Sequence, residues 1–454
     1  YKVEHKLIAV IARIYSGDIT EVHMREYLKM KMEVSSGVRQ GCSGSAVLFK
    51  MVVNMIIDRI DKIGGGFKNE KFRISALFFA DDGLLLSEDA DKAVETIDSV
   101  KRISHEYGLE VSQTKSKVLM FNVKERPEKL SNLEVVSEIR YLGVTVTDKK
   151  RMFEKHKKEM NVRMNRMMNM TSCVIEKSVN RVLIGKTFWK SMVLPSVLYA
   201  SSVMDFRRDE IDKRQVWENS VMRRMLRAPS YSPICALRGE VGASLMRTRI
   251  MKDRLNYEDS LCCERNLLLR EIYVEISGRK SGWSVVTRGY RKEVGLSEKR
   301  ESVGREVISE KVRKWDSEKW RSELECKSSL EIYRMSKKVF GDENVYDNRR
   351  ESVLWCEARL NVMKLECRNR FIGEDTTCKL CGSGDEDLIH FMLICSSLNE
   401  ERAQIQHLQR PHQENAKEVI DSFLFTSGQL EQKKKSLWQL YCSRERKLRR
   451  REVE

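Results

Sequence analysis

Two adjacent aspartates, Asp81 and Asp82, lie between apolar runs in the stretch FRISALFFADDGLLL (residues 72–86). Neighbouring carboxylates repel each other and an unpaired charge is costly to bury, so the pair needs water, a cation or a turn. The pattern predicts a hairpin, with strands over residues 72–79 and 84–86 joined by an Asp-Asp-Gly turn. This turn is either a solvated hairpin tip or a place where two hard oxygen ligands bind Mg²⁺ or Mn²⁺.

The segments around the hairpin show helical and strand patterns in alternation. Apolar residues recur at helical spacing over residues 5–15, and residues 21–37 alternate like paired strands. Residues 46–60 are apolar on almost every side, which predicts a helix buried in a core. The remaining expected elements are a helix over residues 89–108, capped near Asp89 or Asp91 and ended by Gly108, and short strands over residues 117–121 and 138–147.

Beyond Asp148 the sequence becomes charged, Met-rich and helical in its spacing, and strand patterns become rare. The whole chain contains only five prolines, which suits helical modules joined at a few firm breaks. We therefore expect an α+β region followed by mainly α-helical sequence, with boundaries near residues 150, 230 and 370.

The charge balance favours a polyanionic partner. Lys and Arg outnumber Asp and Glu by 84 to 67, which gives a formal net charge of +17. Nucleic acid is the first candidate, although a merely soluble basic protein has the same composition. No stretch approaches the roughly 20 apolar residues of a membrane span, so no membrane partner is expected. The twelve cysteines are scattered along the chain, which favours metal ligation or burial over disulfides.

A glycine-bracketed polar loop precedes the predicted buried helix, in SSGVRQGCSGS (residues 35–45). It is either an ordinary strand-to-helix connection or a loop that approaches a nucleotide closely. In the second case the glycines at 37 and 41 remove side-chain bulk, and Arg39 and Gln40 contact the ligand.

The stretch CKLCGSGDEDLIHFMLIC contains a set of ligands with the spacing of a zinc site. The residues are Cys378, Cys381, His390 and Cys395. Three thiolates and an imidazole at this spacing suit a tetrahedral, closed and therefore structural Zn²⁺ site. The alternative is a group of incidental buried cysteines. The apolar residues expected to form the small core around the ion are Leu388, Phe391 and Leu393.

Taken in order, the glycine loop, the apolar helix, the Asp-Asp hairpin, SQTKSKVLMF (112–121) and YLG (141–143) resemble the palm of a non-LTR, LINE-type retrotransposon reverse transcriptase. Residues 180–204, 223–255 and 359–395 are similar to the downstream helical region and C-terminal CCHC zinc knuckle of the same family. The resemblance runs almost continuously over residues 1–400, and it implies an RNA-directed DNA polymerase, a nucleotidyltransferase.

The resemblance assigns roles to particular residues. It implies template and nucleotide contacts from GVRQGC, namely Gly37, Arg39, Gln40 and Gly41. It implies that Asp81 and Asp82 bind the catalytic Mg²⁺ or Mn²⁺, with Asp81 the firmer ligand, and that Lys115 lies near the triphosphate. The primer grip would be formed by Tyr141, Leu142 and Gly143. The implied partners are an RNA template, a DNA primer or target, and dNTPs.

The resemblance also names the predicted segments and their surroundings. They are a partial palm at 1–150, a helical thumb at 151–230, a helical linker region at 231–370, a CCHC zinc knuckle at 371–400 and a basic tail at 401–454. The family acts on chromosomal DNA, which implies nuclear residence after a cytoplasmic ribonucleoprotein stage. The sequence predicts no oligomeric state.

Two features depart from the family pattern. The glycine loop continues as Ser43, Gly44, Ser45 and Ala46 where the family usually has prolines, which loosens the loop. The family also has a metal-binding Asp on a strand upstream of Tyr1, so we expect this chain to be a C-terminal portion that is inactive alone. The alternatives are a non-catalytic RNA- or DNA-binding remnant and a decayed copy without a selected function.

The helical region offers further basic residues as phosphate contacts. These are Arg181, Lys186, Lys190, Arg223, Arg224 and Arg227. Basic residues at such intervals are either a solvated helix face or contacts to a nucleic-acid backbone. Trp189, Tyr199 and Trp217 are expected in the core. The charge run SRERKLRRREVE (443–454) is either a solvated end, which is the commoner case, or a segment that holds phosphates.

Overall fold

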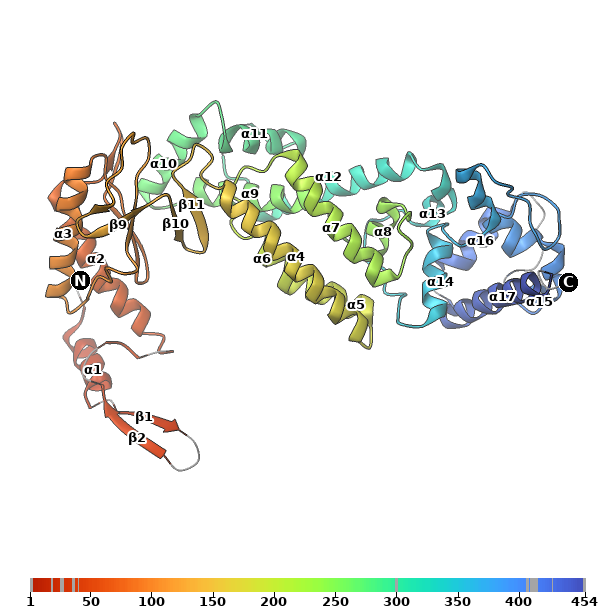
Figure 1. Cartoon of the computed structure of the whole chain (residues 1–454), viewed down its shortest axis with the longest axis horizontal. Coiled ribbons are helices and arrows are strands. Elements are labelled where there is room, and N and C mark those ends of the chain that lie inside the picture. The colour runs from red at the N-terminus through yellow and green to blue at the C-terminus, as the bar shows by residue number, and fades with distance from the viewer. Residues whose placement is uncertain are drawn as a thin grey trace. The chain divides into compact units, whose positions relative to one another are not determined.

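The computed structural model describes residues 3–17, 19–24, 28–34, 37–39, 41–298, 301–405, 408, 415–426 and 428–451. The chain divides into two compact units, residues 1–152 and 153–454 (Figure 1), and each unit is described by itself.

The first unit combines helices with small sheets. Its described helices are α1 (His5–Tyr15), α2 (Ser45–Ile63) and α3 (Ala90–Glu106). Its described strands are β1 (Ile19–Met24), β2 (Leu28–Glu33), β3 (Phe67–Lys68), β4 (Arg73–Ile74), β5 (Ala76–Phe79), β6 (Asp82–Leu85), β7 (Lys117–Leu119), β8 (Lys129–Leu130), β9 (Leu133–Val136), β10 (Glu138–Tyr141) and β11 (Val144–Thr147).

The strands pair mainly with their sequence neighbours. Antiparallel pairs form between β1 and β2, β3 and β4, β5 and β6, and β10 and β11. The third sheet has the order β7-β9-β8, in which β7 runs parallel to β9. The mixed α/β character with small, mainly antiparallel sheets confirms the predicted class. The parallel pair was not predicted, because it joins strands that are separated by β8 and a loop.

Local signals place several of these elements correctly. Helix α3 begins after Asp89, whose carboxylate accepts a hydrogen bond from the Lys92 amide at 2.8 Å. Gly108, with φ of 72°, follows its end. Helix α1 coincides with the predicted helix over residues 5–15, and β10 and β11 divide the predicted strand region over residues 138–147 into a hairpin.

The prediction that residues 46–60 are buried on almost every side is wrong. The residues of α2 that are buried are Ser45, Val53, Ile56 and Ile60. Val47 is 59% exposed. One side of α2 packs against α3 and β5, where Ile56 and Ile60 meet Val100 and Ile103 in a small core. The opposite side of α2 remains at the surface of this unit.

The second unit is helical. Its described α-helices are α4 (Glu154–Lys177), α5 (Arg181–Phe188), α6 (Leu194–Val197), α7 (Arg208–Leu226), α8 (Ile234–Val241), α9 (Met246–Cys262), α10 (Leu267–Gly278), α11 (Trp283–Glu293), α12 (Arg305–Glu325), α13 (Glu331–Ser336), α14 (Arg350–Arg359), α15 (Asn399–Ala403), α16 (Ala416–Phe425) and α17 (Leu430–Arg451). Short 3₁₀ and π turns are η1 (Trp189–Val193), η2 (Ser328–Leu330), η3 (Glu366–Ile372), η4 (His390–Ile394) and η5 (Ser396–Leu398).

One continuous apolar core runs from α4 to α17 in this unit. Its members include Met164, Trp189, Trp355 and Phe391, all nearly inaccessible to solvent. The residues of the predicted knuckle therefore pack into the same core as the preceding helices. In Figure 1, α14 lies beside α17 within this unit, and the two helices are in contact.

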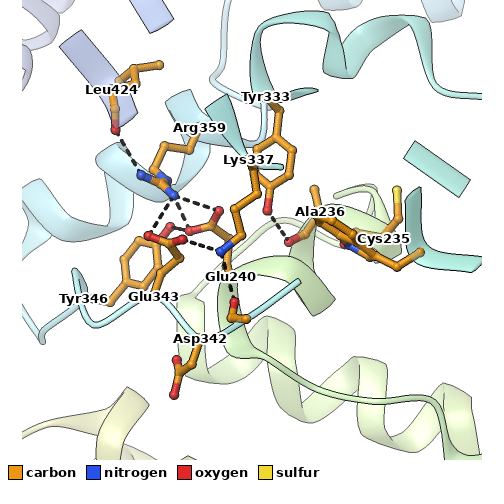
Figure 2. Close-up of polar contacts among 12 residues, drawn as sticks. Cys235, Ala236, Glu240, Tyr333, Lys337, Asp342, Glu343, Tyr346, Arg359 and Leu424 are labelled. Atoms are coloured by element: carbon orange, nitrogen blue, oxygen red, sulfur yellow. Dashed lines mark hydrogen bonds and ion pairs between the residues drawn. The ribbon is translucent and has the colours of Figure 1, made fainter. Parts of the chain in front are cut away.

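Buried ion pairs tie the helices of the second unit together. Arg359 of α14 donates two hydrogen bonds to the Glu240 carboxylate of α8, each 3.1 Å long, and one to the Leu424 carbonyl of α16 at 3.0 Å (Figure 2). Glu240 also accepts a hydrogen bond from Tyr346. The paired Arg359 and Glu240 satisfy each other's charge away from water, as burial requires.

The C-terminal charge run is not simply a solvated end. Residues 443–451 belong to helix α17, in which Leu437 and Leu440 are fully buried. Arg444 is only 3% exposed, because it forms an ion pair with Glu386. A charge run is solvated only where its side chains find no partner, and here a distant carboxylate provides one.

Across the part of the chain that the structure describes, no helix combines the length and apolar character needed to cross a bilayer.

Candidate functional sites: the acidic hairpin and the cysteine-histidine cluster

The acidic pair lies at the tip of the β5/β6 hairpin. Phe79 pairs with Asp82, so that Ala80 and Asp81 form a two-residue turn. Ala80 has φ of 54°, in the left-handed region. Both aspartates are exposed at this turn. The hairpin thus presents two adjacent carboxylates to solvent.

The predicted Asp-Asp-Gly turn is displaced by one residue. Gly83 lies inside β6, opposite Phe78, and a Cβ there would come within 2.7 Å of the Phe78 ring. Phe78 packs against the core of the first unit. The glycine therefore provides space for a cross-strand aromatic ring, and the turn itself is made by Ala80 and Asp81.

The hairpin of β10 and β11 lies within electrostatic reach of the acidic pair. Tyr141 pairs with Val144, and the two turn residues, Leu142 and Gly143, have φ of 46° and 79°. Two positive φ angles are the mark of a type I′ turn. The pKa of Tyr141 is raised, first by partial burial and second by the negative charge of Asp82. Tyr141 of the YLG segment is therefore close enough to the Asp82 carboxylate for that charge to affect its pKa.

The glycine loop packs against the end of α1. Gly37 and Gly41 have φ of 95° and 82°, which favours glycine at both positions. Arg39 donates a hydrogen bond to the Ile14 carbonyl at 2.6 Å, and its guanidinium lies 5.7 Å from the Tyr15 ring centre. These contacts hold the Arg39 side chain on α1. Gln40 lies outside the described residues.

The two lysines near β7 differ in their surroundings. Lys115 is exposed in the turn that precedes this strand. Lys117 forms an ion pair with Glu134 of the neighbouring strand β9. Both lysines are exposed, but the charge of Lys117 is paired with that carboxylate.

The acidic hairpin offers two of the oxygen ligands that a magnesium site would need. Mg²⁺ prefers six oxygen ligands, of which one or two are carboxylates and the others are waters and substrate phosphates. Two adjacent exposed carboxylates fit this preference. Among the described residues, however, no third His, Cys, Asp or Glu joins Asp81 and Asp82 in a group that could hold a metal ion.

The four predicted zinc ligands converge in the second unit. The ligand atoms of Cys378, Cys381, His390 and Cys395 all lie within 4.8 Å of one another. The Cys378 and Cys395 sulfurs are 3.9 Å apart, and the Cys381 sulfur is 3.3 Å from His390 Nε2. A tetrahedron with Zn–S and Zn–N bonds of about 2.3 and 2.0 Å has edges of roughly 3.5–3.8 Å. These four residues therefore fit Zn²⁺.

The local backbone explains why this spacing works. Gly382 and Gly384 have φ of 70° and 71°, and they turn the chain after the first two cysteines. The Cys395 amide then donates to the His390 carbonyl at 2.8 Å, which closes a π turn. Such a turn places residues five apart on one side of the chain, and π turns are frequent at functional sites.

The surroundings of the cluster shift the pKa values of its thiols in opposite directions. Burial raises the pKa of Cys378, and the nearby negative charges of Cys395 and Glu386 raise it further. Burial also acts to raise the pKa of Cys381, but hydrogen bonds with Ser383, Cys378 and His390 outweigh it and lower the pKa. The predicted core residues Leu388, Phe391 and Leu393 are buried around the cluster.

Several basic residues expected at the surface of the helical region are buried instead. Arg181 is 3% exposed and donates to the Met225 carbonyl at 2.8 Å. Lys186 is 6% exposed and pairs with Asp342 at 2.5 Å. These two residues serve packing between helices and do not face a nucleic-acid backbone. Exposed side chains remain at Lys190, Arg224 and Arg227.

The three aromatic residues that were predicted to lie in the core of this region differ in their burial. Trp189 is buried, and its indole donates to Glu218 at 2.9 Å. Trp217 packs partly buried against the core. Tyr199 is 47% exposed, so its assignment to the core is wrong. Tyr199 directly follows Leu198, where helix α6 has ended, and so it is not on a helix face that packs inward.

Two residues beside the cysteine-histidine cluster were not predicted from the sequence. Glu386 is 1% exposed, and its Oε1 lies 3.7 Å from the Cys378 sulfur. Arg444, 58 residues further on, donates to the same oxygen at 2.7 Å. The acidic run DED between the two ligand pairs is visible in the sequence, but no spacing rule connects it with an arginine in the terminal charge run.

The comparison with known families concerns the first unit. It covers the segment with the glycine loop, the acidic hairpin and the YLG turn. Residues 2–146 match the family model of the reverse transcriptase (RNA-dependent DNA polymerase), which supports a reverse transcriptase for this part of the chain.

Proposed function

We propose that the chain is the C-terminal portion of a non-LTR, LINE-type reverse transcriptase, which copies an RNA template into DNA from a DNA primer. The observation that carries the proposal is the acidic hairpin inside the segment that matches the family model. There Asp82 lies within electrostatic reach of Tyr141, the first residue of the proposed primer grip. The net charge of +17 suits a nucleic-acid partner.

Each residue of the proposed site would have its own role. Asp81 and Asp82 would hold Mg²⁺ or Mn²⁺, together with a further carboxylate outside the described residues. A bound ion of this kind stabilises the charge that develops on the attacking and leaving oxygens. Lys115 would neutralise the triphosphate, and the turn at Leu142 and Gly143 would support the primer end. The template and the nucleotide would be contacted by the glycine loop, through Gly37, Arg39, Gln40 and Gly41.

Primer extension tests this proposal. An oligo(dT)-primed RNA template and dNTPs are incubated with Mg²⁺ and either this chain or a product extended upstream. We expect extension from the longer product and little from this chain. In the longer product Asp81→Ala should abolish extension, whereas Asp58→Ala, which removes an exposed aspartate from α2, should leave it intact. Equal activity of these two variants would show that the acidic pair is not the metal site.

A second candidate is a non-catalytic RNA- or DNA-binding protein. It is favoured by the lack, among the described residues, of a third carboxylate beside the acidic pair. Under this alternative the longer product also fails to extend a primer, while this chain binds a template–primer duplex in a filter assay. Binding that weakens steeply with salt would confirm phosphate contacts.

We also propose that Cys378, Cys381, His390 and Cys395 bind a structural Zn²⁺. The four ligands leave no open position, so the ion would hold the chain together without taking part in chemistry. Metal analysis of the purified protein should find one zinc per chain, and Cys381→Ser should lose it. From the family resemblance we propose nuclear residence after a cytoplasmic ribonucleoprotein stage, which imaging of the tagged protein would test.

A further inference from the structure

The second half of helix α17 contacts every segment of the cysteine-histidine cluster. Arg451 donates to the carbonyl of Lys379, which lies between Cys378 and Cys381, at 2.8 Å. Lys447 donates to the Ser397 carbonyl, just after Cys395, at 2.6 Å. The Tyr441 ring meets Phe391 edge-on, with 6.2 Å between the ring centres. The helix thus rests on the backbone that presents the ligands.

A buried ion pair stands at the centre of this contact. Arg444 and Glu386 are 3% and 1% exposed, and Arg444 donates to both carboxylate oxygens. Glu386 in turn lies 3.7 Å from the Cys378 sulfur and accepts from the Glu366 amide at 3.1 Å. A carboxylate beside metal-bound thiolates adds negative charge to a buried site. The guanidinium compensates that charge, and without it the carboxylate would be buried unpaired.

The first half of α17 is anchored in another way. Leu437 and Leu440 are fully buried in the apolar core, and α17 packs there against α14. The buried Lys433 and Lys434 of this half bond to Thr426 and Glu431, which are not ligands of the cluster. The helix therefore has an apolar anchor over residues 430–440 and a polar anchor on the cluster over residues 441–451.

The polar anchor positions a group of exposed basic side chains, which we call the basic end. It consists of Arg446, Arg449, Arg450, Arg451 and Lys379. Arg446 and Arg450 are four residues apart and therefore neighbours on the helix surface. Lys379 comes from the cluster itself and is brought to Arg451 by the hydrogen bond to its carbonyl. Such a group suits the phosphates of a nucleic acid.

We propose that metal occupancy of the cysteine-histidine cluster controls the docking of residues 441–451 through the Glu386–Arg444 pair, and that this docking assembles the basic end for nucleic-acid phosphates. Glu386 and Arg444 are positioning residues, since neither belongs to the four ligands. The metal part of this inference rests on the proposed zinc site, and its phosphate part rests on the proposed nucleic-acid binding.

Hydrogen exchange tests the docking directly. The full chain is compared as purified with Zn²⁺ and after removal of the metal by a chelator. We expect faster amide exchange over residues 441–451 in the metal-free protein, while residues 430–440 remain protected and serve as an internal control. If removal of the metal left the exchange rate over residues 441–451 unchanged, the coupling would be overturned. A protein that binds no Zn²⁺ at all would overturn the zinc site and the coupling together.

Zinc affinity tests the role of the ion pair. Arg444→Met should weaken Zn²⁺ binding roughly 10- to 100-fold, the usual effect of removing a group that supports a ligand. The matched control is Arg446→Met on the same helix, because Arg446 is exposed and bonds only to Cys442 and Ser443 in the contacts seen. Adding Glu386→Gln to Arg444→Met should restore part of the affinity, since the amide needs no counter-ion. Equal affinities of Arg444→Met and Arg446→Met would refute the pair's role.

Nucleic-acid binding is measured last, with a single-stranded RNA oligonucleotide as the probe. Arg444→Met should weaken RNA binding even when Zn²⁺ is in excess, because the pair that links the cluster to residues 441–451 is gone. The double variant Arg449→Met and Arg450→Met should weaken RNA binding at every Zn²⁺ concentration without changing zinc affinity. If this double variant binds RNA like the original chain, the basic end is not a phosphate surface. The exchange and zinc measurements do not depend on that result.

Discussion

The two candidate metal sites of this molecule are built on opposite plans. The acidic pair is exposed on a two-residue turn, and the described residues add no third ligand to it. The cysteine-histidine cluster gathers four ligands, with Cys378 and Cys395 fully buried in the core of the second unit. The difference suits the two proposed roles, because a reacting site has to admit substrate oxygens and a structural site has to exclude them. Stability and reactivity should therefore respond differently at the two places.

The largest expected effect is on stability after loss of the cluster's metal. Cys395→Ser should lower the free energy of unfolding of the second unit by about 5 kcal/mol or more. For comparison, the binding of Zn²⁺ to isolated zinc-finger peptides contributes roughly 10–16 kcal/mol. Replacing Asp81 and Asp82 together by Ala should leave thermal unfolding unchanged, because both side chains are exposed. Calorimetry of the two variants measures the contrast. A similar loss in both would contradict the distinction between a structural and an open site.

The next effect concerns ion pairs in the two units. Arg359→Met removes one partner of a buried pair, leaving Glu240 with no exposed surface, and should cost about 3–5 kcal/mol. The matched change in the first unit is Arg59→Met, whose partner is Glu106 on α3. Both side chains of that pair are more than a third exposed, so its loss should leave the unfolding midpoint of the first unit nearly unchanged. Urea unfolding followed separately in each unit compares the two, and equal losses would refute the role of burial.

The sequence predicted the two candidate sites better than their surroundings. The acidic hairpin and the cluster follow from residues close together in the chain, whose spacing limits where their side chains go. The exposed side of α2 and the parallel pairing of β7 with β9 depend on what packs against each element. The same is true of Arg181, which looks like a surface arginine until the Met225 carbonyl is found beside it. Tertiary contacts of this kind leave no local pattern.

A smaller effect is expected at the turn that carries the acidic pair. Ala80 has φ of 54°, which costs a residue with a Cβ about 1–2 kcal/mol. Ala80→Gly should relieve this strain and, after the larger entropy of glycine in the unfolded chain, stabilise the first unit by about 1 kcal/mol or less. The control is Ala76→Gly in strand β5, which leads into the turn; Ala76 has no positive φ, so this change should destabilise. Two changes of the same sign in thermal unfolding would disprove the strain at the turn.

The smallest expected effect concerns thiol reactivity in the glycine loop. Hydrogen bonds, first from the Ser45 side chain and then from backbone amides, lower the pKa of Cys42 to about 7. Because the thiolate is the reactive form, the alkylation rate of Cys42 should rise through pH 7 and level off above it. Ser45→Ala removes the largest cause of the shift, so the rate at pH 7 should fall several-fold, whereas Ser43→Ala in the same loop should not change it. The cluster thiols should stay unmodified while Zn²⁺ is bound, because the metal occupies their sulfurs. Mass spectrometry after iodoacetamide treatment follows every cysteine at once, and faster labelling of Cys378 than of Cys42 in the zinc-loaded protein would reverse the contrast between the exposed loop and the closed site.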